Sequence, residues 1–158
     1  MNKIKKSKVK FISNYSSEDF AAIMFDWNGK YGDELEDPNM KFRYEICEIL
    51  KEDLNIASDQ LIIDLFIELS KCAKACWGVY ESYHLFAEEV LRRGSIKYLM
   101  IYLEGTMQCF DTILSSKRVR LDIEEKKRIY QYVQNEIKNT NSKSDMRLLE
   151  YALKHFKR

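Results

Sequence analysis

The sequence predicts an all-α protein, an irregular bundle of about seven helices. Apolar residues recur at spacings of three and four along most of the chain, which places them on one face of a helix. The 158 residues include only one proline and five glycines, and serine or aspartate precedes several of the apolar stretches, as helix N-caps do. A short HEAT-like solenoid is the alternative, although no residue pattern repeats at a fixed period.

The composition indicates one helical domain, which we place at residues 16–158. The chain is 46% hydrophobic and 32% charged, and its length is typical of a single core. No apolar stretch reaches the roughly 18 to 20 residues that span a bilayer, because Lys97 and Glu104 interrupt the best one. The start of the chain lacks the apolar segment of a secretory signal, so we expect a cytoplasmic protein with reduced cysteines.

Residues 1–15 are predicted to form a basic, flexible N-terminal arm. Five of the first ten residues are lysine, and none of these ten is acidic. Chain termini are usually poorly ordered unless they dock on the domain.

Two helices are expected in the acidic part of the chain that follows. Ser16 is a candidate N-cap, and the first helix is expected to run through Trp27 and to end at Asn28-Gly29. Pro38 at a first helical position begins the second helix, which is expected to continue to about Asn55.

Ser58 caps a third predicted helix, Asp59 to about Cys76, and a fourth ends at Arg93 before Gly94. Near the end of the chain, Asp122-x-x-Glu125 is a capping box that opens a sixth helix. Ser144 is expected to cap the last one.

The helix predicted over residues 95–114 is expected to be the buried centre of the bundle, with Ser95 as its cap. Its first two turns are apolar almost all round, so other helices should cover it. Its apolar face is formed by Ile96, Leu99, Met100, Leu103, Met107, Phe110 and Leu114.

Charge is distributed unevenly, although the net charge is only +1. Residues 1–10 carry +5, residues 11–70 carry −10, residues 71–114 are neutral, and residues 115–158 carry +6. Such asymmetry indicates either a charged partner or a polar fit between the two ends of the chain.

Neither candidate metal or catalytic motif is complete. Glu81 and His84 have the spacing of a di-iron helix motif, but His155, the only other histidine, lacks a matching carboxylate. Cys72 and Cys76 share a helix face without the further ligands that zinc requires. Phosphate loops, dinucleotide fingerprints and nucleophile elbows are absent. We therefore predict a protein that is not an enzyme, with no catalytic residues, metal or cofactor.

The acidic residues of the early helices are the favoured partner-binding residues. A solvated surface is the plain interpretation of these carboxylates, and recognition of a cationic partner is the functional one. Trp27 and Tyr31 adjoin them and are suited to anchor an interface. The predicted set is Trp27, Tyr31, Asp33, Glu34, Glu36, Asp37, Glu45, Glu48 and Glu52.

The basic C-terminal third supports an alternative function, nucleic-acid binding or regulation. Its cations include Lys117, Arg118, Arg120, Lys126, Lys127 and Arg128, which could neutralise phosphates. No helix-turn-helix pattern accompanies them, and residues 11–70 would repel a polyanion. We therefore favour a protein partner and expect neither nucleic acid nor membrane.

In overall character the chain resembles small helical immunity proteins of bacterial toxin systems, such as those of contact-dependent growth inhibition. The resemblance lies in a small chain with an acidic surface and no catalytic set, without a specific shared motif. It implies that the protein binds a cognate toxin domain, often a basic nuclease, and blocks its active site.

Overall fold

The computed structural model describes residues 3–157 and confirms the all-α class, with no strand in this range. Its α-helices are α1 (Lys3–Asn14), α2 (Met40–Leu50), α3 (Asp59–Cys76), α4 (Tyr83–Gly94), α5 (Leu99–Thr106), α6 (Phe110–Ser116), α7 (Ile123–Asn139) and α8 (Lys143–His155). Four 3₁₀ helices connect them, namely η1 (Ser17–Ala22), η2 (Gly32–Glu34), η3 (Leu54–Ile56) and η4 (Ser95–Tyr98). None of the helices in residues 3–157 is both long and apolar enough to cross a bilayer.

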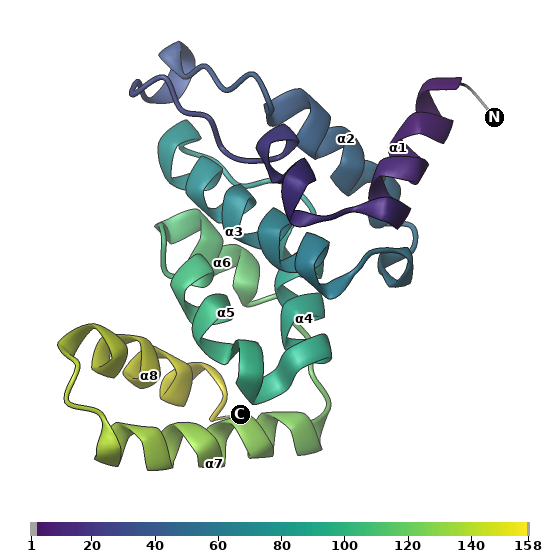
Figure 1. Cartoon of the computed structure of the whole chain (residues 1–158). Coiled ribbons are helices and arrows are strands. Elements are labelled where there is room, and N and C mark those ends of the chain that lie inside the picture. Colours follow the sequence, from purple (N-terminus) through teal and green to yellow (C-terminus); the bar gives the residue numbers. More distant parts are fainter. Residues whose placement is uncertain (1–2, 158) are drawn as a thin grey trace.

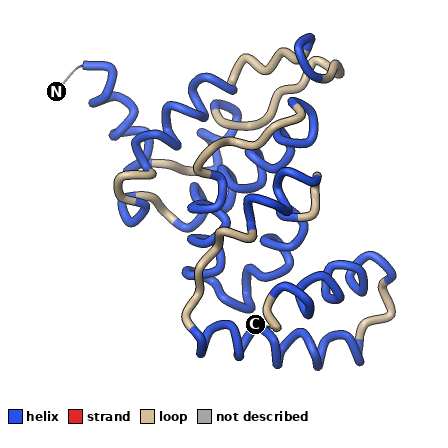
Figure 2. Tube along the Cα trace, turned by 180° about the vertical axis from the view of Figure 1, so that it is seen from behind, coloured by secondary structure: helices blue, strands red, loops and turns tan. Residues whose placement is uncertain are grey.

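The centre of the fold is formed by α3, α4, α5 and α6, which pack on one another (Figure 1). The side chains of Phe66, Tyr83 and Tyr102 are fully buried there. The ring centroid of Phe66 lies 5.3 Å from that of Tyr83 and 6.3 Å from that of Tyr102. The antiparallel α7 and α8 lie at one end of the molecule, and the long loop around η2 lies at the other. Figure 2 shows the same separation from behind.

Local capping signals located several helix starts correctly. Ser58 accepts the N–H of Leu61 at 3.2 Å, and α3 has the predicted bounds. Asp122 accepts the N–H of Glu125 at 2.8 Å at the start of α7. The start of α8 lies slightly earlier than expected, because Ser142 rather than Ser144 is its N-cap.

The predicted basic arm differs from the structure, which places residues 3–14 in α1. The end of this helix docks on the domain because its apolar side chains reach the core. Ile12 is buried, and Phe11 contacts Phe42 edge-on with centroids 5.1 Å apart. Tyr15 follows the helix and donates a hydrogen bond to Asp64 at 2.8 Å.

The helix predicted from Ser16 to Trp27 is wrong beyond its first turns, since only η1 forms. Side chains from later in the sequence bind the backbone groups that a continued helix would use. Arg43 donates to the carbonyls of Ile23 and Met24 at 3.1 and 3.2 Å. Glu68 accepts the N–H of Phe25 at 2.6 Å.

The single helix predicted over residues 95–114 is also wrong. The structure divides it into η4, α5 and α6, and Ser95, with φ of +47°, does not cap it. Only the α5 part is central, with Leu99, Tyr102 and Leu103 buried.

The hydroxyl of Thr112 accounts for the break between α5 and α6. It donates to the carbonyl of Thr106 at 2.8 Å and accepts the N–H of Cys109 at 3.1 Å. The chain therefore turns between these helices and rotates the expected apolar face outward. Phe110 is 71% exposed and Leu114 is 42% exposed.

Candidate functional site

The strongest candidate site is the loop of residues 26–36, which we call the acidic–aromatic loop. Its turns use positive φ at Gly29 and Gly32, of 82° and 61°, which glycine adopts without steric strain. Asn28 donates from its side chain to the carbonyl of Glu34 at 2.9 Å, and its carboxamide oxygen accepts the N–H of Lys30 at 3.1 Å. These bonds link Asn28 to Lys30 and Glu34 within the loop.

A buried ion pair fixes the base of the acidic–aromatic loop. Arg43 and Asp37 have no side-chain exposure, and Nη2 of Arg43 lies 2.5 Å from the Asp37 carboxylate. Burial opposes the arginine cation, but the hydrogen bond and charge of Asp37 raise the pKa of Arg43 above its ordinary value. Asp37 also accepts the N–H of Asn39 at 3.0 Å.

The prediction that Asp37 is a surface residue that binds a partner is therefore wrong, because its side chain is internal. The sequence placed it with the acidic residues of the predicted interface, because it directly follows Glu36. The structure uses its carboxylate to bind Arg43, so it is not available to a partner.

Two predicted anchor residues meet on the outside of the acidic–aromatic loop. Trp27 is 39% exposed and Tyr31 is 51% exposed, and their rings meet edge-on with centroids 4.8 Å apart. The Trp27 indole N–H donates to the carbonyl of Lys30. Large aromatic side chains that stay exposed while locally fixed are typical of interface centres.

A third exposed aromatic residue, which is not among the predicted partner-binding residues, lies beside this pair. Trp77, 75% exposed, ends α3 in a left-handed conformation with φ of 55°. A Cβ on Gly32 would lie 2.9 Å from its ring, so the indole rests directly on η2. In the sequence, the position of this tryptophan between the end of a long predicted helix and Gly78 could have indicated that it is exposed.

A shallow groove of about 270 Å³ adjoins the aromatic pair. Its lining residues are Phe25, Trp27, Tyr31, Lys71, Lys74, Ala75 and Gln108. Lys71 is paired with Glu68 at 2.6 Å. The aromatic pair thus has lysines on the α3 side and carboxylates on the side of its own loop.

The structure separates the predicted carboxylates into two groups. Asp33, Glu34 and Glu36 are exposed on the acidic–aromatic loop, and Glu34 lies 3.1 Å from Lys30. The other group, on or after α2, consists of Glu45, Glu48 and Glu52.

Local cations pair with two of the three carboxylates in the α2 group. Lys8 lies 2.7 Å from Glu45, and its hydrogen bond lowers the pKa of that carboxyl. Lys51, followed by the hydroxyl of Tyr80, lowers the pKa of Glu48. Glu52 is exposed. No ion pair among the described side chains joins residues 11–70 to residues 115–158, so charges of both signs remain at the surface.

The residues weighed for metal binding or catalysis do not assemble into a site. Burial, followed by the charge of Arg118, lowers the pKa of His84. Cys72 is buried, and the Cys76 thiol donates to the carbonyl of Gly78 at 3.1 Å. Among the described residues, no three His, Cys, Asp or Glu side chains converge as metal ligands do.

A second cavity lies at the opposite end of the molecule, between α7, α8 and the segment after α6. We call it the lysine cleft; its volume is about 590 Å³. Its lining residues are Lys117, Val119, Leu121, Lys126, Tyr151, Lys154, His155 and Phe156. His155 Nε2 lies 3.1 Å from the hydroxyl of Tyr102.

Stability is expected to fall between pH 7.5 and 5.5, partly through His155. Burial, then the charges of Lys126 and Lys117, lowers the pKa of His155 below 6.5. Near pH 6.5 the unfolded chain therefore binds more protons than the folded protein, so the free energy of unfolding decreases as pH falls. His84, also with a lowered pKa, contributes in the same direction. Urea unfolding at several pH values should show a weaker dependence for H155Q; equal slopes for H155Q and wild type would contradict this.

Comparison with protein-family models, with curated proteins and with solved structures finds no match for this chain. Its function is therefore inferred from its own residues and their arrangement.

Proposed function

We propose that this chain is a protein-binding inhibitor, an immunity protein that neutralises a cognate toxin domain with a cationic surface. The observation that carries the proposal is the exposed contact between Trp27 and Tyr31 on a loop that also presents Asp33, Glu34 and Glu36. An aromatic centre next to a charged rim matches the anatomy of protein interfaces.

The rigidity of the acidic–aromatic loop favours tight binding. The Asp37–Arg43 ion pair and the bonds of Asn28 hold the loop before a partner arrives. Little conformational freedom is then lost on association, which leaves more of the contact free energy as affinity.

Charge on the loop favours rapid encounter with a basic partner. Asp33, Glu34 and Glu36 extend from the loop into solvent. Exposed charges of one sign steer an oppositely charged protein and raise the association rate, chiefly at low salt. Rapid capture suits an inhibitor whose target is harmful while free.

The test is binding to the protein encoded by the adjacent upstream gene. D33K/E34K/E36K is expected to lower the association rate constant by about tenfold or more at low salt and to weaken its salt dependence, because steering is lost. Stopped-flow fluorescence at 20 and 200 mM salt measures both quantities. The matched control is E124K/E136K/E150K, which makes the same change in net charge on α7 and α8.

The same assay examines the aromatic centre through Y31A. An interface hot spot contributes about 2 kcal/mol or more, so the dissociation constant should rise by about thirtyfold. I123A removes an exposed apolar side chain on α7 and should leave it unchanged. Unchanged binding by both loop variants would exclude this interface. If each loop variant weakens binding only as much as its control variant, the loop has no specific role in binding.

A further inference from the structure

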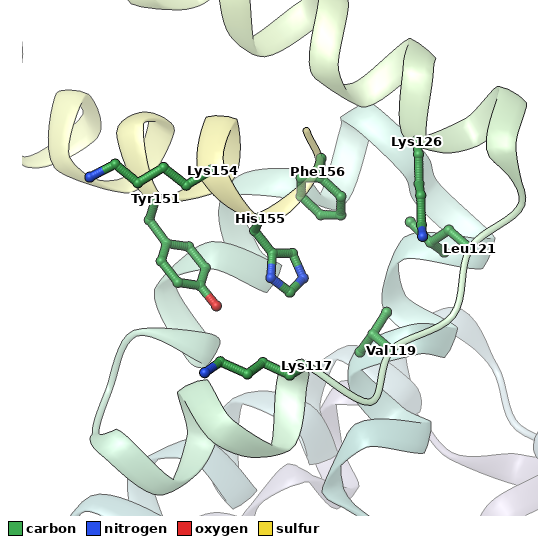
Figure 3. Close-up of a pocket in the computed structure, with 8 residues that line it drawn as sticks. All are labelled: Lys117, Val119, Leu121, Lys126, Tyr151, Lys154, His155 and Phe156. Atoms are coloured by element: carbon green, nitrogen blue, oxygen red, sulfur yellow. The ribbon is translucent and has the colours of Figure 1, made fainter. Parts of the chain in front are cut away.

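The lysine cleft has the volume of a small-molecule site. Its volume of about 590 Å³ lies within the range of roughly 300 to 1,000 Å³ that is usual for ligand pockets. Three segments form it, each from a different part of the fold: the segment that follows α6, the first half of α7, and the end of α8 (Figure 3).

One wall of the lysine cleft is aromatic and fixed in place. The rings of Tyr151 and His155 are stacked at 5.5 Å with an interplanar angle of 17°, and Phe156 meets His155 edge-on at 4.8 Å. The hydroxyl of Tyr151 lies 3.2 Å from that of Ser116, and Tyr102 holds the imidazole. This wall offers a flat surface for a planar ligand ring.

The opposite wall is aliphatic. Val119 and Leu121 face the imidazole of His155 across the cleft (Figure 3).

Two lysines place uncompensated positive charge on either side of this apolar space. Lys117 extends beneath Tyr151, and Lys126 reaches in from α7 (Figure 3). Neither makes an ion pair with any described side chain, and no carboxylate lines the cleft. The ammonium of Lys154 points away, so only its aliphatic stem contributes.

The cations next to Lys126 on α7 differ from it in their pairing. Lys127 lies 2.8 Å from Glu124, and Arg128 lies 3.1 Å from Glu125. The two cations that follow Lys126 on α7 are thus paired. Lys126, which enters the cleft, makes no ion pair with a described side chain, and neither does Lys138 near the end of the helix. A partly enclosed space lined by one sign of charge concentrates counter-ions.

We propose that the lysine cleft binds a small aromatic phosphate, of the class of nucleoside monophosphates. A phosphate monoester carries about −1.5 to −2 charges at neutral pH, and lysine binds phosphate as a point charge. The phosphate would contact one of the two ammonium groups, and the charge of the other adds to its attraction into the cleft. The planar base lies between the aromatic and aliphatic walls.

Isothermal titration of the full chain with AMP, GMP, CMP and UMP tests the proposal. At least one should bind saturably. Its nucleoside and inorganic phosphate should each bind at least about tenfold more weakly, because the nucleoside lacks the phosphate and inorganic phosphate lacks the planar base. K117Q/K126Q should weaken nucleotide binding by about tenfold or more. The matched control K127Q/K138Q removes two exposed lysines from the outer part of α7 and should change affinity less than about twofold.

Two further readouts separate loss of the site from loss of the fold. Thermal unfolding should be nearly unchanged in both double variants, because none of these lysines is buried. The ring proton signals of His155 in NMR spectra should shift on nucleotide addition, and those of His84 should not. A single-stranded oligonucleotide should not displace the bound nucleotide at equal phosphate concentration.

Three results would each overturn the proposal. The first is no saturable binding of any of the four nucleotides. The second is equal weakening by K117Q/K126Q and its control. The third is tight oligonucleotide binding that outcompetes the mononucleotide, which would assign the cleft to a nucleic-acid strand.

Discussion

Replacing Arg43 by methionine is expected to lower the free energy of unfolding by about 3 to 5 kcal/mol, because it leaves a buried carboxylate without its cation. The side chains of Arg43 and Asp37 have no exposure, and their charged atoms lie 2.5 Å apart. The variant also removes the donors to the carbonyls of Ile23 and Met24. Urea unfolding followed by circular dichroism measures the change.

The matched control for R43M is K41M, an exposed lysine on the same helix. Substitution of such a surface residue usually changes stability by less than about 0.5 kcal/mol. R43M/D37N should recover part of the loss, since it removes the unpaired charge as well. An R43M variant within about 1 kcal/mol of K41M would show that the ion pair does not hold the fold.

The same substitution connects stability with the candidate site. Arg43 and Asp37 hold the base of the acidic–aromatic loop, so backbone amides of residues 26–36 should exchange hydrogen faster in R43M than in K41M. Faster exchange confined to this loop is the expected signature of local opening.

Replacing Gly105 by alanine is expected to destabilise the protein by about 1 to 3 kcal/mol. Helix propensity alone predicts a gain of about 1 kcal/mol for this change within α5. However, the added Cβ would lie 2.4 Å from a ring atom of Phe66 and 2.8 Å from the hydroxyl oxygen of Ser70. Phe66 is fully buried, and Ser70 is hydrogen-bonded to Tyr83 at 2.9 Å, so moving either side chain would disturb core packing or this hydrogen bond.

Differential scanning calorimetry measures this effect, at about 2 to 4 °C in Tm per kcal/mol for a chain of this size. G78A is the control, because no heavy atom lies within 4 Å of its added Cβ. A G105A variant more stable than wild type would mean that propensity outweighs the close approach of α3 and α5.

The elements that the sequence located correctly are those with strong local signals. The bounds of α3 and the caps at Ser58 and Asp122 depend on residues three or four positions apart. Such signals act within one helix turn, so they depend little on contacts between distant segments.

The two wrong helix predictions, over residues 16–27 and 95–114, have a shared cause, hydrogen bonds that apolar periodicity does not reveal. Thr112 breaks the helix predicted over residues 95–114. Arg43 and Glu68 bind the backbone after η1, over separations of 19 to 43 residues. Backbone groups satisfied by side chains have no need of a helix.

By itself, the sequence determined the all-α class, several helix starts, and the presence of an aromatic and acidic segment around Trp27, Tyr31 and Asp33. Only the tertiary structure decided that Asp37 is internal, that Trp77 joins the aromatic surface, and that the lysine cleft exists. The physical reason is distance along the chain: helix signals act within a few residues, whereas burial, ion pairing and cavities arise between segments that only folding brings together.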